Sequence, residues 1–371
     1  MNVKYIGALQ DYSGYGEAGR HDVGSLMGNN IGVTAVSPKY SLEIADFGRL
    51  GQLCNNAIDR RIDYGVVIIH TTPNVFPSYV EPGKYNIGRV FWETDKIPQD
   101  FARGCMVLDE IWTGSEFNAQ AIRNAGVEKP IFIIPEAIDT ELELDKIEEY
   151  KIANPKDYKF YSMFEWTERK NPMALLTAYW QEFENDENVS LTLKTYIDNF
   201  TPEKKREIQE NFDRIKRRLG LKKYAPVYMY RNLMDRHQIY RFHKTFDCFV
   251  SAHRGEGWGI PQMEAMLVGN PIISTNCGGI HEYLTNGESA YLVDYELVPL
   301  LGNNRNKQWY TQDQRWAEVD IPQLREYMRA CYTNQDKASK IGGVGQRVVR
   351  DKFSFKSVGG LMAERLREIG R

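Results

Sequence analysis

Cysteine is scarce in this 371-residue chain, and no two cysteines form a CxxC pair. The five lie far apart in the sequence, at Cys54, Cys105, Cys248, Cys277 and Cys331. This pattern excludes a zinc ribbon and gives no sign of a disulfide framework. A chain of this length buries a core that is large enough to fold without either kind of staple.

Long apolar runs and an excess of charge of one sign are also missing. No run of about 18 apolar residues occurs, and no basic segment followed by an apolar one stands at the N-terminus. We therefore expect a cytoplasmic protein that at most associates peripherally with a membrane. The net charge of −3 provides no basic field, so a nucleic-acid partner is disfavoured rather than ruled out.

Short apolar runs instead alternate with longer amphipathic stretches. The expected strands are 3–9, 31–36, 64–70, 86–92, 109–114 and 130–134, then 158–164, 189–195, 226–231, 246–252 and 271–275. This alternation is typical of βαβ units and parallel sheets. A polar stretch at 148–159 separates the two series. The sequence thus predicts an α/β fold with two doubly wound Rossmann-like domains, 1–152 and 153–354.

The segment SGYGEAGR, residues 13–20, spells G-x-G-x-x-G after an expected strand. That pattern is the dinucleotide-binding fingerprint, so an oxidoreductase that uses NAD or FAD is one hypothesis. The fingerprint also calls for a tight turn and an acidic residue about 20 positions on. Here the turn is lengthened, and the second strand runs into Ser37, Pro38 and Lys39 without an acid. We therefore favour a βα turn that does not bind a dinucleotide.

The densest group of functional residues follows the expected strand 246–252. A glycine-rich loop, HRGEGWG, leads into a helix that ends before Gly269. Glu256 and Glu264 stand eight positions apart at the carboxyl end of this strand, where open α/β sheets bind ligands. Carboxylates accept hydrogen bonds from sugar hydroxyls. The structural alternatives are a solvated loop residue for Glu256 and a favourable charge at the helix N-terminus for Glu264.

The stretch GEGWGIPQMEAMLVGNPIIST, residues 255–275, resembles the Glu-x7-Glu signature of retaining glycosyltransferases of the GT-B fold, family 4. The resemblance implies two domains that face each other across a cleft, with a last helix, about 355–371, that crosses back to the first domain. It assigns the ribose hydroxyls of a nucleotide to Glu264 and the hydroxyls of the transferred sugar to Glu256. Further expected donor-binding residues are Gly14, Gly16, Arg254, Gly257, Trp258, Gly259, Ile260, Gly278 and Gly279.

A cationic pair precedes another expected helix. Arg169 and Lys170 follow the strand 158–164, and Asn171 with Pro172 form a helix start. A helix N-terminus is an anion site, and cations placed there stabilise the charge that develops on a leaving diphosphate. The resembled family usually separates its Arg and Lys by several residues, whereas here they are adjacent. The alternative is an ordinary surface pair, and we favour the phosphate clamp.

The first domain also contains candidate site residues, but the sequence patterns around them are less specific. Glu93 stands where many members of the resembled family carry a histidine beside the reaction centre, and a water-exposed carboxylate is an equal alternative. Trp92, His70 and Tyr15 are candidates for contact with the acceptor. A histidine at a strand end is more often structural than catalytic.

The resemblance implies transfer of a hexose from a UDP- or GDP-linked sugar to an acceptor hydroxyl, with retention and without metal or another cofactor. The expected acceptor is a glycan, a surface polysaccharide or a lipid-linked glycan. Besides the oxidoreductase, a GT-B binding protein without catalysis is an alternative. We interpret the basic stretch 203–224 as the solvent-exposed face of a helix. The alternative is a surface that binds an anionic acceptor or a membrane.

Overall fold

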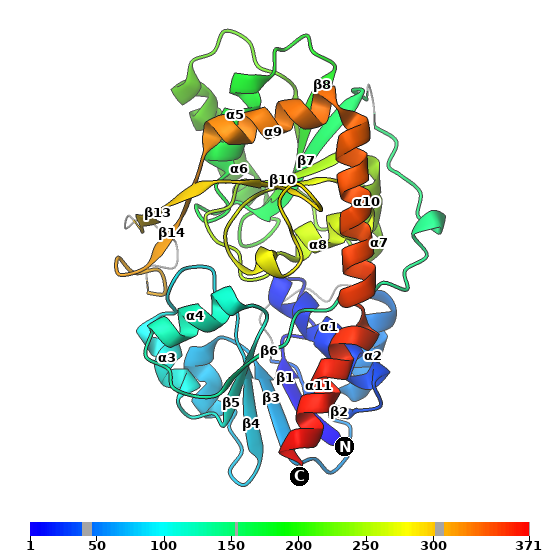
Figure 1. Cartoon of the computed structure of the whole chain (residues 1–371), viewed down its shortest axis with the longest axis vertical. Coiled ribbons are helices and arrows are strands. Elements are labelled where there is room, and N and C mark those ends of the chain that lie inside the picture. The colour runs from blue at the N-terminus through cyan, green and yellow to red at the C-terminus, as the bar shows by residue number, and fades with distance from the viewer. Residues whose placement is uncertain (39–46, 153–154, 301–307, 371) are drawn as a thin grey trace.

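The computed structural model describes residues 1–38, 47–152, 155–300 and 308–370. Two parallel sheets of six strands lie one above the other, each covered by helices (Figure 1). This confirms the predicted fold class of two Rossmann-like α/β domains. Residues 153–154, where we expect the second domain to begin, lie outside the described part of the chain, as does Arg371 at the end of the last expected helix.

The first sheet has the strand order β2-β1-β3-β4-β5-β6. Its strands are β1 (Asn2–Gly7), β2 (Gly32–Val36), β3 (Val66–His70), β4 (Tyr85–Arg89), β5 (Glu110–Thr113) and β6 (Ile131–Ile133). The helices are α1 (Gly14–Gly28), α2 (Gly48–Ala57), α3 (Gln99–Cys105) and α4 (Glu116–Asn124), with short 3-10 turns η1 (Pro73–Ser78) and η2 (Leu144–Lys146). Every residue of β3 is buried, as expected for a central parallel strand that is covered on both faces.

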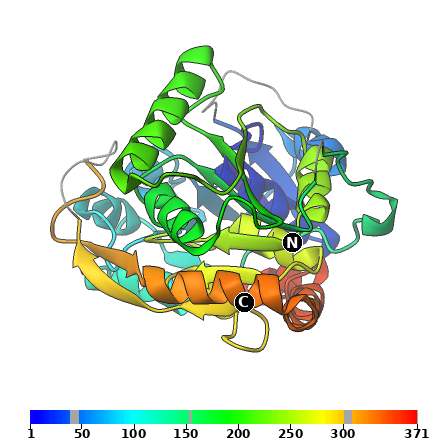
Figure 2. The same ribbon diagram turned by 90° about the horizontal axis from the view of Figure 1, so that it is seen from above.

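The second sheet has the order β12-β11-β10-β7-β8-β9. Its strands are β7 (Tyr158–Glu165), β8 (Val189–Tyr196), β9 (Val227–Tyr230), β10 (Cys248–Ser251), β11 (Ile272–Thr275) and β12 (Tyr291–Val293). The helices are α5 (Pro172–Glu182), α6 (Pro202–Leu219), α7 (Arg236–Thr245), α8 (Ile260–Leu267), α9 (Ile321–Thr333) and α10 (Gln335–Lys352), with the turn η3 (Gly279–Glu282). Helices lie on both sides of this sheet (Figure 2).

The last helix, α11 (Phe355–Ile369), packs along α1 in the first domain (Figure 1). A Cβ atom on Gly359 would lie 2.1 Å from the carbonyl oxygen of Ser25, so only glycine permits this approach. Arg365 fixes the other end, since its Nη2 lies 2.6 Å from Oε2 of the buried Glu110. Close backbone packing and a partly buried ion pair therefore hold the end of the chain on the first domain.

An antiparallel hairpin, β13 (Tyr295–Pro299) and β14 (Arg315–Val319), was not predicted. The following helix α9 begins at Ile321, after β14, because the Asp320 side chain accepts a hydrogen bond from Gln323 N and caps it. We call residues 308–319 the hairpin arm. The arm contacts the first domain: Asp95 N donates to Arg315 O at 3.1 Å, and Lys96 Nζ lies 2.7 Å from Asp313 Oδ2.

In the part of the chain that the structure describes, no helix is both long and apolar enough to cross a membrane.

Candidate functional site

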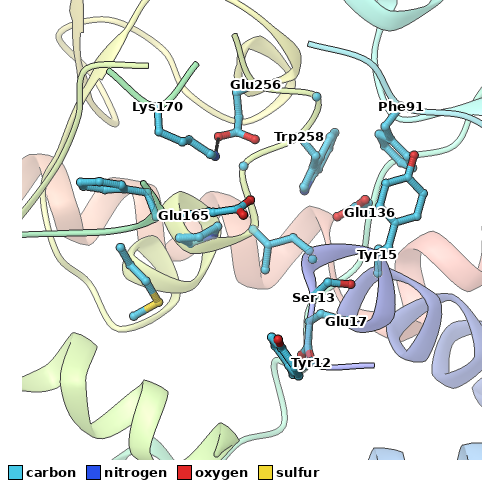
Figure 3. A pocket seen from close by; sticks show the side chains of 18 of the residues that line it. Tyr12, Ser13, Tyr15, Glu17, Phe91, Glu136, Glu165, Lys170, Glu256 and Trp258 are labelled. Atoms are coloured by element: carbon cyan, nitrogen blue, oxygen red, sulfur yellow. Dashed lines mark hydrogen bonds and ion pairs between the residues drawn. The ribbon is translucent and has the colours of Figure 1, made fainter. Parts of the chain in front are cut away.

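A cavity of about 520 Å³ lies between the carboxyl ends of the two sheets. Both domains line it, and Figure 3 shows Tyr15, Phe91 and Glu136 on one side with Lys170 and Glu256 on another. The predicted residues that line the cleft are Gly14, Tyr15, His70, Trp92, Glu93, Arg169, Lys170, Glu256, Gly257, Trp258, Gly259, Ile260 and Glu264. The fold therefore brings together candidates that lie up to 250 positions apart in the sequence.

Arg169 and Lys170 lie in the loop between β7 and α5, as the sequence predicts. Asn171 adopts a left-handed conformation with φ of 52°, and its side chain accepts a hydrogen bond from Ala174 N and caps α5. This sharp turn directs both cations toward the β10–α8 loop. Arg169 Nη1 donates to Gly255 O at 2.9 Å, and Lys170 Nζ hydrogen-bonds with Glu256 Oε2.

The charge state of Glu256 follows from these cations. Burial alone raises the pKa of a carboxyl group, but Lys170 and Arg169 outweigh it and lower the pKa of Glu256 to about 2. Burial lowers the pKa of Lys170 in turn, although Glu256 opposes this shift. Glu256 is thus an anion near neutral pH, paired with Lys170.

Glu264 lies in the first turns of α8 and is 2% exposed. Arg236 Nη2 bonds to its Oε1, while His243 Nε2 lies 3.3 Å from Oε2. Burial opposes the charge of Glu264, but Arg236 outweighs it and lowers the pKa. The carboxylate retains further lone pairs, which a ligand hydroxyl can use.

The N-terminus of α8 faces the same cleft. Gly259 precedes this helix with a φ of +97°, a conformation that favours glycine, and no side chain caps its first amides. Gly259, Ile260 and Pro261 all line the cavity. Uncapped amides at a helix start are donors for an anionic ligand.

Glu93 and the hairpin arm meet on the first-domain wall. Tyr310 in the arm donates a hydrogen bond to Glu93 Oε2 at 3.2 Å, and Arg169 Nη2 lies 3.5 Å from Oε1. The ring of Tyr310 also stacks on Trp92, with centroids 5.1 Å apart. Glu93 therefore takes part in a contact between the two domains. The ring of Trp92 is covered on one side by Tyr310.

His70 ends β3 and lies behind Tyr15, with ring centroids 5.3 Å apart. Its Nδ1 is 2.7 Å from the Tyr5 hydroxyl, which donates to Asp22 Oδ2 at 3.0 Å. Burial lowers the pKa of His70 to about 4. The imidazole is neutral near pH 7, and its polar contacts belong to a buried network of the first domain.

Four predicted donor contacts are not among the cavity-lining residues. Gly16 N donates to the capping Ser13 Oγ at 3.3 Å, and a Cβ atom on Gly16 would lie 2.1 Å from Asp11 O. Arg254 turns away from the cleft, since its Nη2 lies 2.7 Å from Glu318 Oε2. Gly16 thus serves the packing of the βα turn, and Arg254 holds the hairpin strand β14 through Glu318.

Gly278 and Gly279 lie beneath the β10–α8 loop instead of facing the cleft. Cβ atoms on them would lie 2.3 Å from Glu256 O and 2.0 Å from Gly257 O. Gly279 N donates to Glu256 O at 2.9 Å, so this amide is already engaged. Only glycine fits at these two positions, because the backbone of the loop that carries Glu256 packs directly against them.

Sequence reasoning missed Arg236, which links the two domains. Its Nε lies 3.1 Å from Glu17 Oε1 of α1, while Nη2 reaches Glu264. Asp235 and Gln238 form a capping box at the start of α7, directly after β9. That D-x-x-Q pattern at a strand's carboxyl end was a signal in the sequence.

Lys194 and Glu136 were also missed. Lys194 comes from the buried strand β8, lines the cleft and has its pKa lowered to about 8 by burial. Its signal was a single charged residue inside the β-strand pattern SLTLKTY. Glu136 follows β6 in IIPEAID and is 4% exposed. Nothing in its local sequence marks it as buried.

The fold and the cleft define a class of protein: a two-domain α/β protein of GT-B architecture with an interdomain ligand cleft. A family model described as glycosyl transferases group 1 matches residues 145–298, which include the clamp and both motif glutamates. No match is found among curated proteins.

Solved structures match over nearly the whole chain. HepE from Anabaena, in complex with UDP and glucose, has a TM-score of 0.66 at 14% identity and covers 99% of this chain and 100% of its own. Sucrose-phosphate synthase from Thermosynechococcus elongatus has a TM-score of 0.71 at 13% identity, with 100% and 99% covered. A glycosyltransferase from Rickettsia africae has a TM-score of 0.67 at 13% identity, with 100% and 98% covered. These likenesses show the GT-B fold.

Proposed function

We propose that this protein is a retaining glycosyltransferase that moves a hexose from a nucleoside diphosphate sugar to an acceptor hydroxyl. Glycosyl transfer from a nucleotide sugar is supported by the family match over residues 145–298. The observation that carries the proposal is the arrangement of Arg169, Lys170 and Glu256 beside the uncapped start of α8. Cations, amide donors and a sugar-binding carboxylate converge there within one cleft.

In this proposal Glu264 accepts hydrogen bonds from the ribose hydroxyls, and Glu256 accepts them from the hexose. Arg169, Lys170 and the amides of α8 hold the diphosphate and stabilise the charge that builds on its outer phosphate. The anomeric carbon–phosphate oxygen bond breaks, and a bond to the acceptor oxygen forms on the same face. The departing phosphate oxygen takes the acceptor proton, so no side-chain base is required. The protein's contribution is positioning and electrostatic stabilisation.

The clamp is cationic, and we propose that no metal and no other cofactor takes part. UDP is the first nucleotide to test because the HepE structure contains it, with GDP as the second. The proposed acceptors are a glycan, a surface polysaccharide or a lipid-linked glycan. We propose that the protein acts on them in the cytoplasm or at a membrane surface.

The test is a thermal-shift screen with UDP-, GDP- and ADP-linked hexoses and with NAD and FAD, followed by measurement of nucleoside diphosphate release. A ligand that binds the folded state stabilises it by RT ln(1 + [L]/Kd), so the correct nucleotide raises the melting temperature most. A shift with NAD or FAD alone would favour the oxidoreductase, whose fingerprint glycine Gly16 serves packing here. Binding without any release of diphosphate would favour a non-catalytic protein.

A further inference from the structure

Glu136 is an ionisable group in the cleft that the proposed chemistry does not use. It follows β6, is 4% exposed and lines the cavity beside Phe91, Tyr15 and Trp258 (Figure 3). Its Oε2 atom is fully buried and has no hydrogen-bond partner among the described residues. Leaving a buried polar atom without a partner is unfavourable, so the side chain gains when a group that enters the cleft bonds to the carboxyl group.

Arg89, the cation whose charge acts on Glu136, makes no ion pair with this carboxyl group among the described residues and bonds to other groups. Arg89 bonds through Nε and Nη2 to Asp22, at 3.0 and 3.1 Å, and to the carbonyl oxygens of Ile134 and Pro135. The hydrogen bonds of the Arg89 guanidinium therefore go to Asp22 and to backbone carbonyls and not to Glu136. Burial raises the pKa of Glu136 to about 8, and the charges of Asp22, Glu256 and Glu17 act in the same direction, against Arg89.

At neutral pH the side chain is consequently an uncharged acid, which donates one hydrogen bond and accepts others. Such a group suits a neutral hydroxyl. An anionic ligand group is disfavoured there by the charges of Glu256 and Glu17. Glu136 also lies on a different wall from Arg169 and Lys170, so the diphosphate is held elsewhere.

We propose that Glu136 binds a hydroxyl group of the transferred sugar. This inference rests on the proposed function, because it assigns the sugar end of the same cleft. Glu136 and Glu256 then hold the hexose from two walls, one as a neutral donor and the other as an anionic acceptor.

The experiment compares Glu136→Gln and Glu136→Leu with wild type and with Glu143→Gln, a change at an exposed glutamate. Isothermal titration uses UDP and UDP-glucose, GDP and GDP-mannose, and ADP and ADP-glucose. For the nucleotide that wild type binds, both variants should bind the free diphosphate within about twofold. The Gln variant should keep the affinity for the sugar nucleotide, since an amide also donates and accepts. The Leu variant should lose about tenfold to a hundredfold, the range for an unmade hydrogen bond in a polar site.

Two further readouts separate this role from a structural one. The melting temperature of the Leu variant should equal or exceed that of wild type, because an unpartnered polar atom is removed. In wild type, kcat/KM for release of diphosphate should fall above about pH 8, and the Gln variant should lack this limb. The charged or titratable groups facing Glu136 are Arg89, Asp22, Glu17, Glu256 and Tyr283.

Equal affinity of the Leu variant and wild type for the sugar nucleotide would overturn the inference while the proposed function stands. So would a Gln variant as weak as the Leu variant, because the ionised form would then be required. Loss of free diphosphate binding in both variants would place Glu136 in the fold or the nucleotide site instead. If wild type binds none of the six probes, the proposed function fails, and the inference fails with it.

Discussion

Glu256 and Glu136 line the same cleft and are both buried, yet their pKa values move in opposite directions. Burial disfavours the charge of each, but Lys170 bonds directly to Glu256 and lowers its pKa to about 2. Glu136 has no such partner among the described residues, and its pKa rises to about 8. The comparison shows that a cation bonded directly to the carboxylate, rather than the extent of burial, decides which carboxyl group is charged. The second-domain wall is therefore ionic at Glu256, while the first-domain wall is neutral at Glu136, although Glu17 and Glu93 of that domain are ion-paired.

The largest expected effect comes from removing the cation that creates this difference. Lys170→Met keeps the apolar stem, removes the charge and should raise the pKa of Glu256, because burial is then opposed only by Arg169 and, to a smaller extent, by His253. Loss of one charge-stabilising donor should lower kcat for diphosphate release about 100- to 1,000-fold. Steady-state kinetics with the sugar nucleotide measure this effect.

The matched control is Lys146→Met, which changes an exposed lysine in η2. It should leave kcat unchanged. A kcat of Lys170→Met within about tenfold of wild type would show that the ionic wall does not serve the leaving group.

The next effect concerns the nucleotide end of the same ionic wall. Glu264→Ala removes an acceptor for ribose hydroxyls, and charged hydrogen bonds of this kind contribute about 1.5–3 kcal/mol. The affinity for the nucleoside diphosphate should fall roughly tenfold to a hundredfold, as measured by calorimetry. Glu143→Ala, at an exposed glutamate, is the control. Unchanged donor affinity and turnover would remove Glu264 from the site.

The buried His70 of the first domain should make the stability of the protein depend on pH. Because burial lowers the pKa of His70 to about 4, the unfolded chain binds a proton between pH 6.5 and 4 that the folded protein does not. The free energy of unfolding should therefore decrease as the pH falls through this window. His70→Gln should remove about 2 kcal/mol of the difference between pH 7 and pH 4.5.

Urea unfolding of wild type and His70→Gln at the two pH values measures that difference. Each protein serves as its own reference, so a general loss of stability in the variant does not affect the result. Identical pH dependence in both proteins would mean that His70 is not held neutral by the first-domain wall.

The smallest effect is expected where the two walls meet. Tyr310→Phe removes the hydroxyl that donates to Glu93 but keeps the ring that stacks on Trp92. One neutral-to-charged hydrogen bond at the edge of the cleft should change kcat/KM for diphosphate release by about tenfold or less. Tyr310→Ala removes the stacked ring as well and should cost more. Equal losses in both variants would assign the whole effect to the hydroxyl group.

The secondary structure was predicted correctly where the candidate residues lie in one continuous segment. The strand, loop and helix from 246 to 269 were predicted, as was the helix start at Asn171 and Pro172. Local rules of capping and periodicity suffice for such segments. Gly16, Arg254, Gly278 and Gly279 do not line the cavity, because a motif gives spacing along the chain and not the direction of a side chain or an amide.

The amino-acid sequence by itself determined the alternation of strands and helices, the two-domain α/β class and the candidates Arg169, Lys170, Glu256 and Glu264. Only the tertiary structure decided which ionisable groups are charged, because a pKa depends on burial and on neighbours from distant segments. It also brought Arg236 to Glu17 and Tyr310 to Glu93 across the two domains. Above all, it placed Glu136 in the cleft without a partner for its buried oxygen, an environment that no local pattern encodes.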